Sequence, residues 1–260
     1  MASYQQELAV AKRAVLAASK LCQSVRQAMV SPSSASSMSM TKEDKSPVTI
    51  ADYGSQAIIC HMLKQQFPND PVVAEEDAAD LRVAVQPTSP AADSASADSS
   101  PPTSPLEQIL RHVQQTLGDD TIQSTDILNF IKHGNGQVAA QGRFWTLDPI
   151  DGTKGFLRGD QYAICLALIV NGKVVLGVLG CPALRLQTNS DTSHDGEDEE
   201  EGHLFMAIQG QGCFRESLSS SIDGVSSPPT PVSVSTHSTT MVQSFEASHG
   251  NHEAQQDGAA

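Results

Sequence analysis

The sequence predicts a layered α+β or α/β protein in which helices pack on a β-sheet. Apolar residues recur at helical spacing in residues 5–29 and 52–67, whereas residues 162–170 and 173–179 are β-rich. Asn171-Gly172 joins these two β-rich runs and is a strong signal for a two-residue hairpin turn. Helical periods and strand periods are therefore both present in one chain.

Composition excludes several classes of protein. The chain has 260 residues, enough for one large domain or two modest ones. A formal net charge of −14 argues against nucleic acid as the main partner, but it allows a phosphorylated small molecule whose charge is offset by bound cations. The five cysteines lack C-x-x-C spacing, so we expect neither structural zinc nor a disulfide scaffold. With no membrane span or secretory signal, we expect a cytoplasmic protein. We also predict that it is a monomer.

The other predicted elements follow from local signals. The apolar spacing of the first helix favours a packing helix over a transit peptide. In chain order, the further predictions are a strand at Val48–Ile50, a helix that begins directly after Asp52, a strand at Val72–Ala74, helices at 106–117 and 121–132, a turn at Gly134–Gly136, and strand character at 203–215.

Three polar inserts interrupt these elements, at residues 31–40, 84–105 and 187–202. The second insert is rich in Pro, Ser, Ala and Asp and has almost nothing to bury, so we expect disorder there. The acidic run in the third is expected to be a solvated loop rather than a metal site. We predict an N-terminal α+β domain at 1–215 and the start of a C-terminal α/β domain at 216–260.

The segment FWTLDPIDGTKGFLRGD (144–160) carries the candidate chemistry. Asp148 and Asp151 follow an apolar run, and the proline between them is expected to end strand pairing because it has no N–H. Gly152 lets a ligand approach the backbone, and Thr153 offers a hydroxyl and an amide at a helix start. Oxygen ligands beside an anion cradle suit Mg²⁺ and a phosphate ester, so the segment predicts a metal-dependent phosphatase site.

Two upstream acids are also predicted at element ends. Asp52 stands before a helix, and Glu75 follows the strand that ends at Ala74. Asp52 could serve as a helix N-cap as well as a catalytic group, because a cap leaves one carboxylate oxygen free. Glu75 could instead be a solvated acid, and Glu76 is the neighbour most easily confused with it.

Four stretches, SPVTIAD (46–52), FPNDPVVAEED (67–77), residues 145–182 and EASHGNHE (246–253), resemble the lithium-sensitive, Mg²⁺-dependent phosphomonoesterase superfamily, which includes the inositol monophosphatases. The closer resemblance is to its 3′(2′),5′-bisphosphate nucleotidase branch, because Thr153 is followed by KGFLRG rather than by an Asn-Phe pair. The resemblance implies a sandwich of the sugar-phosphatase type. It also implies hydrolysis of the 3′-phosphate of 3′-phosphoadenosine 5′-phosphate, or of related 2′-phosphate and phosphosulfate nucleotides.

The resemblance implies roles for individual residues. Asp52 and Thr153 would orient the attacking water. Two Mg²⁺ ions would be bound by Glu75, Asp148, the Ile150 carbonyl and Asp151. The substrate would be bound by Asp151, Gly152, Thr153 and His249. A third, weaker ion is implied between Asp52 and Glu75, together with inhibition by Li⁺ and often Na⁺. His249 could equally be a surface histidine.

The family pattern also includes a late Trp-Asp motif that supplies a ligand of the second metal. No such motif follows Asp151, and Trp145 is the one tryptophan in this sequence. We therefore expect an incomplete second domain and an incomplete nucleotide pocket. An inositol (poly)phosphate phosphatase, a non-catalytic metal- or nucleotide-binding remnant, and a chain whose site is completed by a partner stay open as alternatives.

Overall fold

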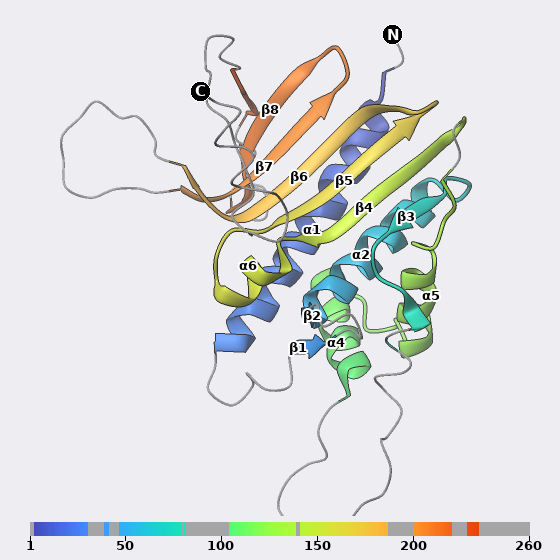
Figure 1. Cartoon of the computed structure of the whole chain (residues 1–260), viewed down its shortest axis with the longest axis vertical. Coiled ribbons are helices and arrows are strands. Elements are labelled where there is room, and N and C mark those ends of the chain that lie inside the picture. The colour runs from blue at the N-terminus through green and yellow to red at the C-terminus, as the bar shows by residue number, and fades with distance from the viewer. Residues whose placement is uncertain are drawn as a thin grey trace, which may run out of the picture.

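The computed structural model describes residues 3–30, 39–41, 47–79, 81, 104–138, 141–186, 200–219 and 228–233. These residues form one seven-stranded sheet with long helices on one of its faces (Figure 1). The predicted layered α+β class is confirmed. None of the helices in this part of the chain is long and apolar enough to cross a membrane.

The helices and strands follow one another in the order predicted. They are α1 (Gln5–Val30), β1 (Ser39–Thr41), β2 (Pro47–Thr49), α2 (Ile50–Gln66), β3 (Val72–Ala74), α4 (Pro105–Leu117), α5 (Ser124–Lys132), β4 (Arg143–Asp151), α6 (Thr153–Arg158), β5 (Ala163–Val170), β6 (Lys173–Leu186), β7 (Glu200–Ile208), β8 (Gly212–Ser217) and β9 (Thr230–Pro231). The large sheet has the order β3-β4-β5-β6-β7-β8-β9, and β1 and β2 form a separate pair. Strands β3 and β4 are parallel, and the other neighbours in the large sheet are antiparallel.

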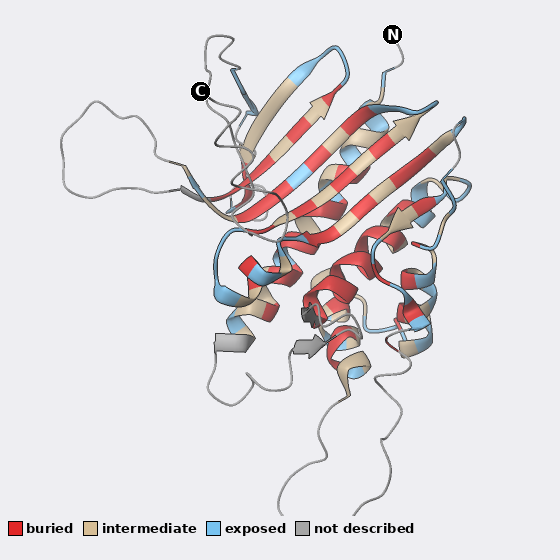
Figure 2. Ribbon diagram, in the orientation of Figure 1, coloured by how far each residue is buried: buried red, intermediate tan, exposed pale blue. Residues whose placement is uncertain are grey.

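The core lies between the sheet and the two long helices α1 and α2. Buried and less buried residues alternate along β5, as expected for a strand with one covered face (Figure 2). A Cβ at Gly180 would lie 2.6 Å from Ser19 Oγ and 2.8 Å from Val15 Cγ1. The glycine therefore allows α1 to lie directly on β6.

The hairpin prediction is confirmed, and β6 is longer than predicted. Asn171 and Gly172 have φ angles of 50° and 73°, the left-handed conformations that a tight β-hairpin turn requires. Strand β6 continues to Leu186, past the expected end at Leu179, because its pairing with β7 resumes at Arg185 after an irregularity.

The predicted start of the second helix was wrong. Ile50 belongs to α2 rather than to the preceding strand, so Asp52 lies inside the first turn of the helix and is not its N-cap. Ile50 and Ala51 are both fully buried, and helical geometry places them in the core beside Tyr53. This gain in buried apolar surface outweighs the β preference of the Val-Thr-Ile run.

The proline at position 149 does not end strand pairing as predicted. Strand β4 continues through Pro149, and the register with β5 shifts between Asp148 and Asp151, where pairing resumes opposite Ala163. A bulge accommodates the missing N–H within the ladder. As a result, both aspartates remain attached to the sheet.

The margins of the inserts are more ordered than predicted. Ser39 and Met40 lie in β1 and so do not belong to the predicted loop 31–40. Ser104 caps α4 through a capping box, in which its Oγ accepts from Glu107 N–H at 3.2 Å and its own N–H donates to Glu107 Oε2 at 2.9 Å. The interiors of all three inserts lie outside the described residues.

The proposed domain boundary at residue 215 stays a prediction. Strand β9 pairs with β8 and so belongs to the same sheet as the N-terminal strands. Most of the segment 216–260 lies outside the described residues.

Candidate active site

The parallel pairing of β3 and β4 brings two predicted metal ligands together. Val72, Val73 and Ala74 pair in register with Trp145, Thr146 and Leu147. The residues that follow the paired segments are Glu75 and Asp148. Because the two strands run in the same direction, these acids lie side by side at one end of the strand pair although 73 positions separate them in the sequence.

Asp148 lies at the centre of a group of carboxylates. Its pKa is raised to about 7 by burial and, in second and third place, by the negative charges of Glu75 and Asp151. A hydrogen bond from the Ile150 N–H to Asp148 Oδ1, at 3.2 Å, opposes the increase. Repulsion among three acids at one strand end is relieved when a cation binds between them.

A tight turn after β4 carries the remaining residues of the motif. Gly152 has a φ of 86°, a left-handed conformation that favours glycine, and α6 starts at Thr153. The Thr153 hydroxyl donates to the Ile150 carbonyl at 3.1 Å. The hydroxyl predicted to orient water and the carbonyl predicted to bind metal are therefore hydrogen-bonded to each other in this structure.

Close backbone packing holds this turn. A Cβ on Gly155 would lie 2.4 Å from the Gln161 carbonyl oxygen, so only glycine allows α6 to lie against the start of β5. Phe156 is buried and meets Tyr162 edge to face, with ring centroids 4.9 Å apart. The helix start that carries Thr153 is thus fixed by packing on its far side.

Asp52 is a deeply buried carboxylate, with 2% of its surface exposed. Its position in the first turn of α2 stabilises a carboxylate, because the helix N-terminus carries partial positive charge. Helix α6 packs against β2, the strand that leads directly into α2. Helix α6 therefore lies against the strand that precedes the helix of Asp52.

The donor set suits Mg²⁺ in chemistry but is not a finished coordination shell. Its three acids, Glu75, Asp148 and Asp151, offer the hard oxygen ligands that Mg²⁺ prefers. Among the described residues, no three His, Cys, Asp or Glu side chains already form a metal-binding cluster. The metal roles of these residues therefore stay predictions, and ion binding would have to draw the carboxylates together.

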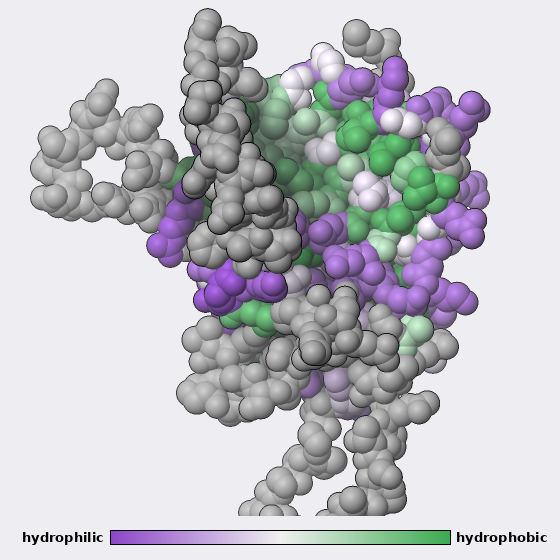
Figure 3. Space-filling view, in the orientation of Figure 1, coloured by the Kyte–Doolittle hydropathy of each residue, from purple (hydrophilic) through white to green (hydrophobic). Residues whose placement is uncertain are grey.

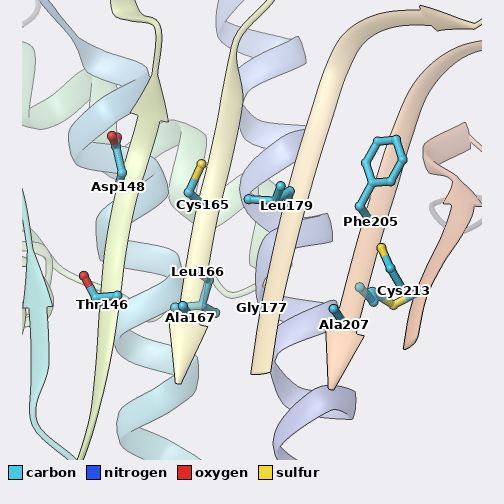
Figure 4. A pocket seen from close by; sticks show the side chains of 11 residues that line it. Thr146, Asp148, Cys165, Leu166, Ala167, Gly177, Leu179, Phe205, Ala207 and Cys213 are labelled. Carbon is cyan, nitrogen blue, oxygen red and sulfur yellow. The ribbon is translucent and has the colours of Figure 1, made fainter. Parts of the chain in front are cut away.

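A cavity of about 320 Å³ extends from Asp148 across the sheet face opposite α1 (Figure 4). Its wall is formed by residues of β4 to β8 that include Thr146, Cys165, Leu179 and Phe205. Hydrophobic surface is visible over these strands in Figure 3. The motif did not predict the apolar wall beside the acids, although a signal for it was present in the sequence of β5, which is apolar on both faces.

Cys165 lies directly opposite Asp148 in the β4–β5 register. The pKa of its thiol is raised to about 12 by burial first and then by the charges of Asp151 and Asp148. This thiol therefore stays protonated and is not a nucleophile at neutral pH. All five cysteines are free.

The predicted nucleotide-contacting residue, His249, lies outside the described residues. Of the basic residues that follow the motif, Arg158 is exposed and forms an ion pair with Asp160 at 2.8 Å.

The chain is similar to known proteins. The sequence model of the inositol monophosphatase family matches residues 4–259. The chain is 41% identical over 261 residues to 3′(2′),5′-bisphosphate nucleotidase 1 of Candida albicans. This match covers 97% of this chain and 66% of that protein. It is 39% identical to 3′(2′),5′-bisphosphate nucleotidase 1 of Arabidopsis thaliana, over 96% of this chain and 67% of the relative.

Solved structures of the family are more distant. CysQ from Bacteroides thetaiotaomicron, described as a bacterial member of the inositol monophosphatase family, superposes with a TM-score of 0.45 at 18% identity, covering 98% of this chain and 68% of that one. The chain spans 66%, 56% and 66% of the length of three Candida albicans relatives that it matches.

Proposed function

The chain belongs to the inositol monophosphatase family, and we propose that it carries the metal-binding site of a Mg²⁺-dependent 3′(2′),5′-bisphosphate nucleotidase. The proposed reaction releases phosphate from the 3′ position of 3′-phosphoadenosine 5′-phosphate and leaves AMP. The observation that carries the phosphatase proposal is the grouping of Glu75, Asp148 and Asp151 at one end of β3 and β4. The names of the relatives support the nucleotide as substrate class.

The proposed roles follow from the requirements of phosphate-ester hydrolysis. A phosphate monoester dianion repels an incoming hydroxide, and bound Mg²⁺ supplies the charge that offsets this repulsion and makes bound water more acidic. Glu75 and Asp148, with the Ile150 carbonyl, would hold one ion, and Asp148 and Asp151 would hold a second. Asp148 would be shared between the two.

Asp52 and Thr153 are proposed to orient the attacking water. The Thr153 hydroxyl donates its hydrogen bond to the Ile150 carbonyl, so its oxygen can accept a hydrogen bond from water. The Asp52 carboxylate would accept a hydrogen bond from the other O–H of that water. The amides of Gly152 and Thr153 are proposed to bind the phosphate oxygens, since the turn leaves no side chain at Gly152 to block approach. Inhibition by Li⁺ is proposed to reflect occupation of the second metal position.

The test is Mg²⁺-dependent phosphate release by the purified 260-residue chain. The substrate is 3′-phosphoadenosine 5′-phosphate, with inositol 1-phosphate assayed alongside and Asp151→Asn as the blank. We expect nucleotide-selective, Li⁺-sensitive release that is lost in the variant. Faster release from inositol 1-phosphate would contradict the nucleotidase proposal and indicate an inositol phosphatase instead. A folded chain that binds Mg²⁺ but releases no phosphate from either compound would instead indicate a metal-binding remnant.

A further inference from the structure

The buried side chain of Gln56 joins the two chain segments that carry Asp52 and Glu75. It lies on α2, one helical turn after Asp52, and is fully buried. Its Nε2 donates to the Glu76 carbonyl at 2.6 Å, and its Oε1 accepts from the Glu76 N–H at 2.9 Å. The amide thus pairs with the backbone of Glu76 through both of its polar atoms.

The same amide also reaches α5. Gln56 Nε2 donates a further hydrogen bond to the Ile131 carbonyl, at 3.2 Å, near the C-terminal end of that helix. One side chain on α2 is therefore bonded to the segment after β3 and to α5. An apolar residue in its place would leave buried backbone groups without these partners, which is costly.

The segment that receives these bonds has little other support from the sheet. Strand β3 is three residues long and lies at the edge of the large sheet. On its outer side it contacts the turn after α5: the Ala74 N–H donates to the Gly134 carbonyl at 2.8 Å, and Val73 bridges to Asn135. Beyond Ala74 the chain leaves the sheet, and Gln56 is bonded to it two residues later.

We propose that Gln56 is a positioning residue of the phosphatase site. By holding the backbone of Glu76 against α2, it sets the position of Glu75 relative to Asp52 on that helix and to Asp148 on β4. This inference rests on the proposed function, in which these carboxylates share metal ions. It concerns only the approach of the carboxylates and assigns Gln56 no contact with metal or substrate.

Gly134 provides a second way to disturb the same contact. A Cβ at this position would lie 2.7 Å from Gln56 Nε2 and 2.8 Å from Ala74 Cβ. Gly134→Ala must therefore displace the Gln56 amide, the end of β3, or both. The substitution does not change the chemical identity of Gln56 or of any carboxylate residue.

The test is Mn²⁺ binding to the 260-residue chain, measured by electron paramagnetic resonance and calorimetry, with Mn²⁺ as the probe for the Mg²⁺ site. Gln56→Met keeps the length of the side chain and removes its hydrogen bonds. We expect it to weaken Mn²⁺ binding by about 10- to 100-fold, the usual effect of losing a group that orients metal ligands. Gly134→Ala should weaken binding in the same direction.

The matched control is Gln114→Met on α4. Gln114 Nε2 donates to the carbonyls of Ile122 and Asp120, at 2.9 and 3.4 Å, so this variant loses the same kind of amide–carbonyl bonds away from the acids. Its Mn²⁺ affinity should stay within about twofold of the parent, which separates positioning from general loss of stability.

The outcomes distinguish this inference from the function on which it rests. A parent chain that does not bind Mn²⁺ overturns the proposed function and the role of Gln56 with it. Unchanged affinity in folded Gln56→Met, with a parent that binds, overturns the positioning role alone. If Gln56→Met does not fold, Gly134→Ala is compared with Gln114→Met instead. Weaker Mn²⁺ binding by Gly134→Ala than by Gln114→Met supports the positioning role, and equal binding overturns it.

Discussion

The two ends of β4 differ in how charge is balanced. At the first end, Arg143 donates to Glu7 Oε1 at 2.8 Å and to Asp70 Oδ2 at 2.7 Å. Trp145 Nε1 donates to the same Asp70 oxygen at 3.0 Å, and the guanidinium lies 5.1 Å from the ring centroid of Phe67. The acids at this end, here called the balanced end, have a cation supplied by the chain itself.

At the opposite end of β4, here called the acidic end, acidic side chains lie close together. There Asp148 has its pKa raised to about 7 by burial and by the neighbouring acids Glu75 and Asp151. A fold does not need such repulsion, and groups with strongly shifted pKa values concentrate at functional sites. The first end is therefore a structural cluster, whereas the second is the proposed cation site.

The largest expected effect is at the acidic end. Asp148→Asn removes the carboxylate that both proposed metal positions share, so Mn²⁺ binding should be lost and any phosphate release should fall by about 10³-fold. Calorimetry and a phosphate assay measure the two effects. Substantial Mn²⁺ binding by this variant would show that the metal lies elsewhere.

The next effect concerns the balanced end. Arg143→Met leaves Glu7 and Asp70 without their shared cation, and unfolding in urea should show a loss of about 1–3 kcal/mol. Mn²⁺ affinity should not change, because the substitution lies at the other end of the strand. A parallel loss of metal binding would mean that the two ends are not independent.

Stability should depend on pH through Asp148. Its pKa is raised from 3.8 in the unfolded chain to about 7 in the fold, so the folded state holds a proton that the unfolded state has released. That contribution is complete below the unfolded pKa and is lost as the pH rises through about 7.

Without divalent cations, the melting temperature of the parent should therefore fall between about pH 5 and about pH 8 by more than that of Asp148→Asn. The difference between the two melting curves isolates this carboxyl from the other acids. Added Mg²⁺ should restore part of the parent's loss at the higher pH. Identical pH dependence of both proteins would contradict the assigned shift.

The smallest expected effect lies in the hairpin next to the balanced end. Asn171 has a φ of 50°, and its Oδ1 accepts from the Gly142 N–H at 3.0 Å. Asn171→Ala should cost about 1 kcal/mol, because alanine is disfavoured in the left-handed conformation. Asn171→Gly is the matched variant and should cost less. Both are measured by urea unfolding, and a change in Mn²⁺ affinity in either would contradict the independence of the two strand ends.

Local signals predicted most of the elements. The Asn-Gly hairpin, the helical spacing of α1 and the short β3 all depend on nearest neighbours in the chain, and all three are confirmed. The start of α2 and the continuation of β4 through Pro149 were missed. Both depend on the tertiary contacts of the residues concerned, and local secondary-structure propensity gives no information about these contacts.

The sequence by itself determined which groups are available for chemistry. The spacing of Asp148, Asp151, Gly152 and Thr153 is local and can be identified without a structure. The tertiary structure decided where these groups meet the others. The parallel register of β3 and β4 brings Glu75 to Asp148, and a buried glutamine, which has no local signal, ties that segment to the helix of Asp52. Pairing between segments far apart in the chain depends on the whole core, because only the packed fold brings them within hydrogen-bonding distance.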